Sequence, residues 1–386
     1  MSVSFSETAR IITRGIESRA FPAAAIEVGN HDRVLWRQAF GRLTYASDAA
    51  PVSDDTIFDL ASLTKVIATA TLVMRAVEEG ALSLDDRVAD RLPSWRGADR
   101  ADVSVADLLE HASGLTAYLP FFRDHRGRVD FERAIGTLPL EYAPRTQSIY
   151  SDLGFMLLAF ILEDVGGKTF AALFDDVFHL KAEAIGTKSR GLRPQAEDSG
   201  TESRTARDAT CGFRLQAEET LRFNPPREWR ARCAPTELDL WRGRLLQGEV
   251  HDENTWALGG AAGHAGLFGT AADVGAFARA ILAGLGGAST IARPETLARF
   301  VQKSTVPGSS RALGWDTMLP TSSCGTRLSA VAIGHTGFTG TSLWIDPAQD
   351  LYIVLLTNRV HPTRDNNAIP PVRRAVHDAV ASTVNG

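Results

Sequence analysis

"FDLASLTKVIATATLVMRAVEEG", residues 58–80, sets a serine and a lysine three positions apart, Ser62 and Lys65, where an apolar helical pattern begins. Three residues are nearly one helical turn, so both side chains lie on one face of the predicted helix. A serine hydroxyl needs a neighbouring base before it acts as a nucleophile. A helix N-terminus and burial both favour a neutral amine, and lysine, unlike arginine, can give up its proton. Serine also caps helices for structural reasons, so the pair by itself leaves that role open.

Two further motifs follow along the chain. IYSDLGF places Tyr150 and Asp152 two residues apart at the start of a predicted helix. GHTGFTG places His335, Thr336 and Gly337 on a predicted strand. Ser-x-x-Lys, then a polar-x-polar pair, then a Lys- or His-Thr-Gly strand is the ordered signature of penicillin-recognising serine hydrolases. The three motifs together predict that the serine of the first motif is catalytic.

The chain resembles the serine β-lactamase-like family of class C β-lactamases, DD-peptidases (penicillin-binding proteins) and related esterases over nearly its whole length. The stretches that carry the resemblance include FDLASLTK, LLEHASGL, YSDLGF, GGAAGHAGLFGTAADVGAFA, HTGFTGTSLWIDP and LLTNRVHP. The resemblance implies that Ser62 is acylated and that Lys65 helps to take its proton. It implies that Tyr150 is a second proton-transfer group and that His335 stands where class C enzymes carry lysine. The main-chain N–H of Phe338 is expected to complete the oxyanion hole with that of Ser62.

Two positions depart from the family pattern. The second motif usually reads Tyr-x-Asn, whereas this chain has Asp152. An ionised carboxylate only accepts hydrogen bonds, and it would favour Lys65 as an ammonium, which moves the base role toward Tyr150. Phe338 brings a bulky side chain where small residues are common. Both departures weaken an inference of efficient β-lactam hydrolysis and leave the acyl-enzyme chemistry intact.

Substrate-binding residues are expected beside these groups. Asp152, Thr336 and Gly337 belong to the motifs themselves. Arg359 and Arg364 follow the last predicted strand, in a region where members of this family can meet a substrate carboxylate. Arginine suits that bidentate contact, although a solvated salt bridge is an equal alternative for either residue.

The strand and helix patterns predict an α/β (α+β) fold, with an antiparallel sheet built from both termini and flanked by helices. Residues 23–44 are typical of a hairpin, and three short strands with turns at Gly334 and at DPAQD precede a C-terminal helix. We assign residues 1–65 and 286–386 to an α/β subdomain, and residues 66–285 to an inserted, mostly helical subdomain with long loops, within a single β-lactamase-like domain. The polar residues 186–236 are expected to form a long surface loop.

Composition narrows the possible partners. A net charge of -5 without a basic run gives no reason to expect nucleic acid. Three scattered cysteines form neither a disulfide framework nor a zinc site, and no metal or other cofactor is expected. The N-terminus lacks an apolar signal-peptide core, and no run is long enough to span a membrane. We therefore expect a cytoplasmic protein, or a periplasmic or secreted one if a leader has been removed, and leave its oligomeric state open.

Three other motifs receive structural interpretations. VGGKTF, residues 165–170, lacks the first glycine of a phosphate-binding loop. VHDEN, residues 250–254, and the nearby His264 do not have the spacing of a standard metal site, so hydrogen bonding is the favoured role. His111 and Ser113 are expected in a turn that packs beneath the site.

The leading hypothesis is a serine hydrolase that works through an acyl-enzyme on a small-molecule substrate. Its candidate substrates are D-amino-acid peptides, muropeptide fragments included, small esters, and β-lactams as slow substrates or acylating inhibitors. The alternative is a catalytically weak, penicillin-binding sensor or scaffold protein with the same fold.

Overall fold

A computed structural model describes residues 4–178 and 220–386. The part of the predicted surface loop from 186 to 219 lies outside the described residues. A six-stranded sheet has the order β2-β1-β11-β10-β9-β8, and every neighbouring pair is antiparallel. Its strands are β1 Ala23–Gly29, β2 Val34–Gly41, β8 Asp316–Thr317, β9 Ile333–Thr336, β10 Ser342–Asp346 and β11 Leu351–Thr357.

This sheet joins the two ends of the chain. Ala24 on β1 pairs with Thr357 on β11, and the β1–β2 hairpin continues from that edge. Every residue of β1 and β11 is buried, because both strands are covered by helices on both faces. The predicted antiparallel sheet, built from the termini and flanked by helices, is confirmed.

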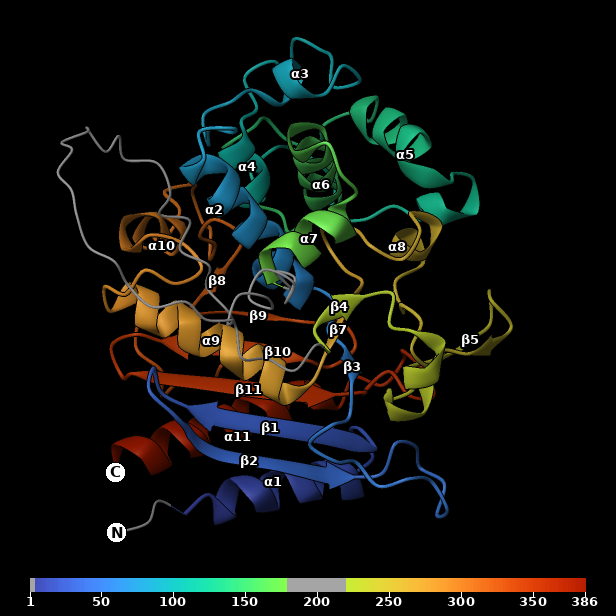
Figure 1. Ribbon diagram of the computed structural model, residues 1–386, viewed down its shortest axis with the longest axis vertical. Helices are drawn as coiled ribbons and strands as arrows, with labels where there is room; N and C mark the ends of the chain where they lie inside the picture. Colours follow the sequence, from blue (N-terminus) through green and yellow to red (C-terminus); the bar gives the residue numbers. More distant parts are fainter. Residues whose placement is uncertain (1–3, 179–219) are drawn as a thin grey trace, which may run out of the picture.

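Helices cover the two faces of the sheet (Figure 1). The terminal helices α1 Ser6–Glu17 and α11 Ile369–Asn385 contact each other and lie on one face. The apolar helix α9 Ala271–Leu285 contacts β1, β10 and β11 on the opposite face. Two apolar cores result, one between the sheet and the terminal helices and a larger one that runs from α9 into the helical region.

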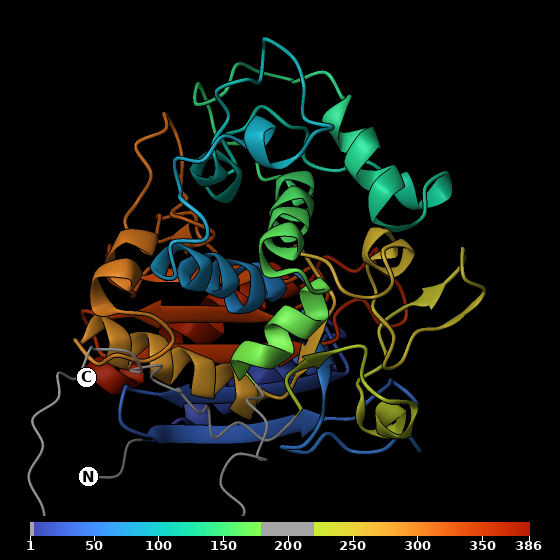
Figure 2. The ribbon, with the colours of Figure 1, turned by 45° about the horizontal axis from the view of Figure 1, so that its top comes forward.

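The helical region stands above α9 in Figures 1 and 2. Helix α6 Asp152–Gly166 is its centre, because its residues from 153 to 162 are all buried and it contacts α2, α4, α5 and α7. The other helices there are η1 Lys65–Ala70, α2 Thr71–Glu78, α3 Val88–Arg91, α4 Val105–Leu109, η2 Phe121–Arg123, α5 Gly127–Gly136, α7 Phe170–Phe178, α8 Glu253–Ala257 and α10 Pro294–Phe300. How the chain divides into subdomains stays a prediction.

Short strands link the two regions. β3 Phe58–Asp59 pairs with β7 Leu267–Gly269, which also pairs with β4 Arg222–Phe223. A second small hairpin, β5 Leu238–Asp239 and β6 Arg244–Leu245, projects from the side of the molecule (Figures 1 and 2). The 3-10 helix η4 Arg227–Arg232 lies nearby. The motif of Ser62 and Lys65 directly follows β3, so it lies at the junction between sheet and helices.

One predicted turn is wrong. Gly334 lies inside β9, paired with Trp344, and the chain turns instead over residues 337–340. A Cβ at Gly334 would lie 2.3 Å from the Trp344 ring. The glycine therefore makes room for an indole on the neighbouring strand, which is one of the uses of glycine within sheets.

Candidate active site

The turn that carries Ser62 has an uncommon backbone. Ala61 has a φ of 47°, in the left-handed region that side-chain-bearing residues seldom occupy. The Ala61 amide donates to Asp59 Oδ1 at 2.8 Å, and Thr64 Oγ1 donates to the Ala61 carbonyl at 2.7 Å. These two bonds hold the strained turn, which presents the serine at the N-terminal end of the helix, as the sequence predicts.

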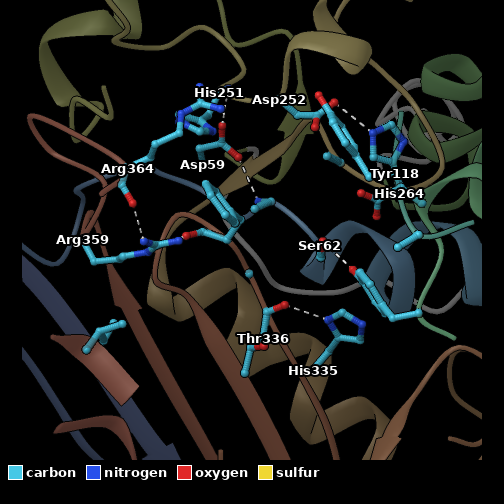
Figure 3. Close-up of a pocket in the computed structure, with 18 of the residues that line it drawn as sticks. Asp59, Ser62, Tyr118, His251, Asp252, His264, His335, Thr336, Arg359 and Arg364 are labelled. Carbon is cyan, nitrogen blue, oxygen red and sulfur yellow. Dashed lines mark hydrogen bonds and ion pairs between the residues drawn. The ribbon is translucent and has the colours of Figure 1, made fainter. Parts of the chain in front are cut away.

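Figure 3 shows Ser62 among the residues that line the pocket. Its hydroxyl lies within hydrogen-bonding distance of the two predicted proton-transfer groups. Tyr150 Oη donates to Ser62 Oγ at 2.8 Å, and Lys65 Nζ donates to the same oxygen at 3.1 Å. Tyr150 comes from the segment just before α6, some 90 residues further along the chain. Both separations are within the range that proton transfer requires.

Lys65 has the surroundings of an ammonium ion. Its side chain is fully buried, and its Nζ donates to Ser62 Oγ, to Asp152 Oδ1 at 2.7 Å and to the His264 carbonyl at 3.2 Å. Three acceptors match the three hydrogens of an ammonium. Burial lowers the pKa of Lys65, but the charges and hydrogen bonds of Asp152 and Tyr150 outweigh burial, so the net pKa is raised. A lysine held in this way cannot accept the Ser62 proton.

Tyr150 is placed by its neighbours on both sides. The His111 ring lies 4.7 Å from the Tyr150 ring, and its Nδ1 accepts from the Ser151 amide, so the turn of His111 does pack beneath the site. The guanidinium of Arg311 lies 5.0 Å from the centre of the Tyr150 ring. Burial raises the pKa of Tyr150, and the Lys65 charge lowers it only in part, so the net pKa is raised. A neutral phenol is therefore the resting form.

His335 lies on β9, with its ring 5.8 Å from that of Tyr150. Its Nδ1 is 2.9 Å from the Thr336 carbonyl, which can only accept, so Nδ1 carries the hydrogen and Nε2 is the free acceptor. Burial, followed by the charges of Lys65 and Arg311, holds the pKa of His335 well below its usual 6.5. The imidazole is therefore neutral and supplies no positive charge beside Tyr150.

Two main-chain amides are available for an oxyanion. No described residue accepts a hydrogen bond from the amide of Ser62 or of Phe338. The turn after β9 is held against the nucleophile turn, because Thr339 Oγ1 donates to the Asp59 carbonyl and Thr341 Oγ1 to that of Leu60. This close contact also explains the glycine of the third motif, since a Cβ at residue 337 would lie 2.7 Å from the Leu60 carbonyl.

Ser62 opens into a pocket of about 610 Å³. All the predicted site residues line this pocket except Lys65, which is buried behind it. The substrate-binding candidates differ in their partners. Arg364 is engaged by two carboxylates, Glu237 at 2.6 Å and Glu253 at 2.6 Å. Within the described part of the chain, Arg359 donates only to main-chain carbonyls. The Phe338 ring, half exposed, lies under the Arg359 guanidinium at 4.4 Å.

Sequence reasoning missed two arginines that line the same pocket, Arg311 and Arg373. Arg373 is 7% exposed. Among the described residues its Nε has no partner, and its one hydrogen bond goes to the Thr341 carbonyl at 3.4 Å. Burial lowers its pKa to about 10. A signal was present, because Ile369, Arg373, Val376 and Val380 share the apolar stripe of α11. Arg311 lies in an irregular segment, where no periodicity points to it.

The other motifs have structural roles. Gly167 of VGGKTF is the left-handed cap of α6. His264 Nε2 is 2.9 Å from Asp252 Oδ1, and His251 Nε2 is 2.9 Å from Glu237 Oε2. Within residues 4–178 and 220–386, no three His, Cys, Asp or Glu side chains are grouped to hold a metal ion. In the same residues, no helix has both the length and the apolar character needed to cross a bilayer.

A sequence profile described as Beta-lactamase matches residues 8–378. The chain belongs to this family. It is 28% identical to the putative D-alanyl-D-alanine carboxypeptidase of Escherichia coli (strain K12), over 91% of this chain and 81% of the relative. It is 29% identical to the N-acetylmuramyl-L-alanine amidase of Bacillus subtilis (strain 168), over 94% of this chain and 83% of the relative.

Solved structures agree on the fold of this β-lactamase family member. A penicillin-binding protein homologue from Caulobacter crescentus superposes with a TM-score of 0.70 at 17% identity, covering 98% of this chain and 97% of that chain. A class C beta lactamase from Rhodobacter sphaeroides gives a TM-score of 0.67 at 22% identity, with 97% and 98% covered. At such identities the likeness establishes the β-lactamase/transpeptidase-like fold and does not name a substrate.

Proposed function

We propose that this protein is a serine hydrolase that cleaves an amide or ester through an acyl-enzyme on Ser62. The observation that carries the proposal is the position of Ser62 Oγ, within hydrogen-bonding distance of both Tyr150 Oη and Lys65 Nζ. The two unpaired amides beside it could bind the oxygen on which negative charge develops. The substrate class that we favour is a peptide from bacterial cell-wall material, because both curated relatives described above are named for cell-wall peptides.

The proton path follows from the resting charges. Ser62 Oγ attacks the carbonyl carbon as its proton passes to Tyr150 Oη, and Tyr150 gives its own proton to the leaving nitrogen or oxygen. The bond to the leaving group then breaks, and water attacks the ester in the reverse sense to release the acid and free Ser62. Because Tyr150 stays neutral overall, this relay does not require a phenolate, which its raised pKa disfavours. The Lys65 ammonium stabilises the charge that passes through Tyr150.

A free carboxylate on the substrate is expected from the arginines of the pocket. Arg359 and Arg373 are both 7% exposed, and neither has a carboxylate partner among the described residues. A buried guanidinium without a counter-ion is costly, and a bound carboxylate would offset this cost. A peptide with a free C-terminus supplies such a carboxylate, whereas a simple ester does not.

A substrate panel tests the proposal. A p-nitrophenyl ester, a D-alanyl-D-alanine peptide, N-acetylmuramyl-L-alanine and nitrocefin are offered to wild type and to Ser62→Ala. We expect turnover of at least one peptide and of the ester, lost in Ser62→Ala, and a single phosphonate adduct on Ser62 by intact-mass analysis. Acylation without turnover on every substrate would instead support the sensor alternative. An adduct on Ser113 or Ser151 would overturn the assignment of the nucleophile.

A further inference from the structure

A second groove continues from the active-site pocket. It measures about 560 Å³ and shares two lining residues with that pocket, Glu253 and Arg364. The ion pair between these residues, 2.6 Å long, forms the boundary between the two hollows. The far wall of the groove is the β5–β6 hairpin, which contributes Leu240 and Trp241. A substrate that reacts at Ser62 could therefore extend across the ion pair and reach the hairpin.

The hairpin exposes apolar surface that the fold does not use. Leu240 is 92% exposed and Trp241 is 43% exposed, beside Leu238 at 54%. Exposed apolar groups that gather in one place mark binding sites more often than scattered ones do. Tryptophan combines a large flat apolar face with little conformational freedom, which makes it a common anchor for ligands.

Trp241 is held in place from several sides, unlike an ordinary surface side chain. Its ring packs edge-on against Phe122 at 4.7 Å and Trp256 at 5.3 Å. The next residue, Arg242, has a side chain 2% exposed that binds Asp239 at 2.7 Å and the carbonyls of residues 250 and 251. A short hairpin anchored in this way fixes the partly exposed indole of Trp241 before any ligand arrives, so less entropy is lost on binding.

Polar groups also line the groove. Arg123, Thr363 and Asp365 are exposed there, and the carboxylates of Glu237, Asp239 and Glu253 line it as well, each paired with an arginine or a histidine. A flat apolar face with a rim of hydrogen-bonding groups matches a pyranose ring, which has C–H faces and a hydroxyl edge. Each of these carboxylates keeps acceptor sites beyond its ion pair, and sugar hydroxyls could donate to them.

We propose that this groove binds the saccharide part of a muropeptide whose amide or ester reacts at Ser62, with Trp241 as the stacking platform. This inference rests on the proposed function for the reaction itself. It adds a subsite and a specificity-determining residue: a sugar-bearing substrate occupies both hollows, and a sugar-free peptide occupies only the first.

The test measures binding separately from turnover. In the Ser62→Ala background, calorimetry compares N-acetylmuramyl-L-alanyl-D-isoglutamine with acetyl-L-alanyl-D-isoglutamine. We expect the sugar-bearing ligand to bind at least tenfold more tightly, and Trp241→Ala to remove about tenfold of its affinity, as loss of an aromatic anchor typically does. Trp241→Ala should leave the affinity for the sugar-free peptide within about twofold. Leu245→Ala, an exposed apolar change on the same hairpin outside the groove, is the matched control.

The outcomes separate the two proposals. Equal affinity for the two ligands, or an unchanged sugar affinity in Trp241→Ala, overturns the saccharide groove. A Trp241-dependent sugar affinity without any turnover in wild type supports the groove and contradicts the proposed hydrolase. Far-ultraviolet circular dichroism and the thermal midpoint of each variant establish that an affinity loss does not come from unfolding. Trp241→Phe, which keeps an aromatic face, should restore part of the affinity if stacking is the cause.

Discussion

Replacing Asp152 by asparagine should change the charge of Lys65 and, through it, the chemistry of Ser62. The carboxylate lies 2.7 Å from the Lys65 ammonium, whose side chain is fully buried. An opposite charge at such a distance typically shifts a pKa by about 1–3 units. Without that charge, burial dominates, and the pKa of Lys65 should fall below its usual 10.5.

Each unit by which the pKa falls would correspond to about 1.4 kcal/mol. In Asp152→Asn the folded protein would bind fewer protons than the unfolded chain wherever the pH lies between the lowered pKa and about 10.4. The loss of stability should therefore be largest at and below the lowered pKa and should disappear above about pH 10.4. Urea denaturation of wild type and variant at pH 7 and pH 10 measures this difference.

The same substitution should alter selectivity. A neutral Lys65 could accept the Ser62 proton, and the asparagine amide could donate a hydrogen bond to a ligand, as in the common Tyr-x-Asn motif. We expect a higher ratio of kcat/KM for nitrocefin to that for a p-nitrophenyl ester, together with a new acidic limb in the pH profile of the variant. Asp316→Asn removes a carboxylate from the same pocket without touching Lys65, and should produce no such limb. An unchanged ratio would refute the reasoning and direct attention to Phe338.

Two further predictions concern buried basic side chains. Arg373→Met should raise KM several-fold for a peptide with a free carboxylate and leave kcat/KM for a neutral ester nearly unchanged. It should also raise the thermal midpoint, because a buried charge without a carboxylate partner is removed. Equal losses of activity on both substrates would contradict a carboxylate-binding role. Burial holds the pKa of His377 at about 3 and that of His335 well below 6.5, so the folded state resists protonation at both. Stability should therefore be full above pH 6.5 and fall as the pH drops below it, by up to about 1.4 kcal/mol per unit for each histidine. Urea midpoints between pH 7 and pH 5 measure this, and His377→Gln should flatten the curve.

Sequence patterns predicted the main features of the fold because local signals agreed with one another. The hairpin at 23–44 became β1 and β2, and the C-terminal helical pattern became α11. The order of the three motifs predicted the family, and the structure brings Ser62, Lys65 and Tyr150 into contact. Motifs succeed in this way because chemistry restricts both the residue type and its approximate spacing.

What the sequence could not predict depends on contacts between distant segments. The third acceptor of Lys65 is a carbonyl some 200 residues away, at His264. The lowered pKa of His335 follows from burial and from the charges of Lys65 and Arg311, and of these three causes only Lys65 belongs to a motif. Gly334 was predicted to lie in a turn because glycine is common in turns. Glycine is needed there for another reason, since a Cβ would collide with the Trp344 indole on the neighbouring strand. The platform at Trp241 depends on packing between a short hairpin and two separate helices.

The pairing of β1 with β11 also has a consequence for biosynthesis. A ribosome adds about 5–20 residues per second, so β11 emerges on the order of 15–60 s after the serine motif. Until then β1 lacks its neighbour in the sheet, and the turn that carries the Phe338 amide has only just been made. The nascent polypeptide thus carries Ser62 before the Phe338 amide has been made. In the proposed mechanism both groups are needed, so we expect acylation of Ser62 only when synthesis is nearly complete.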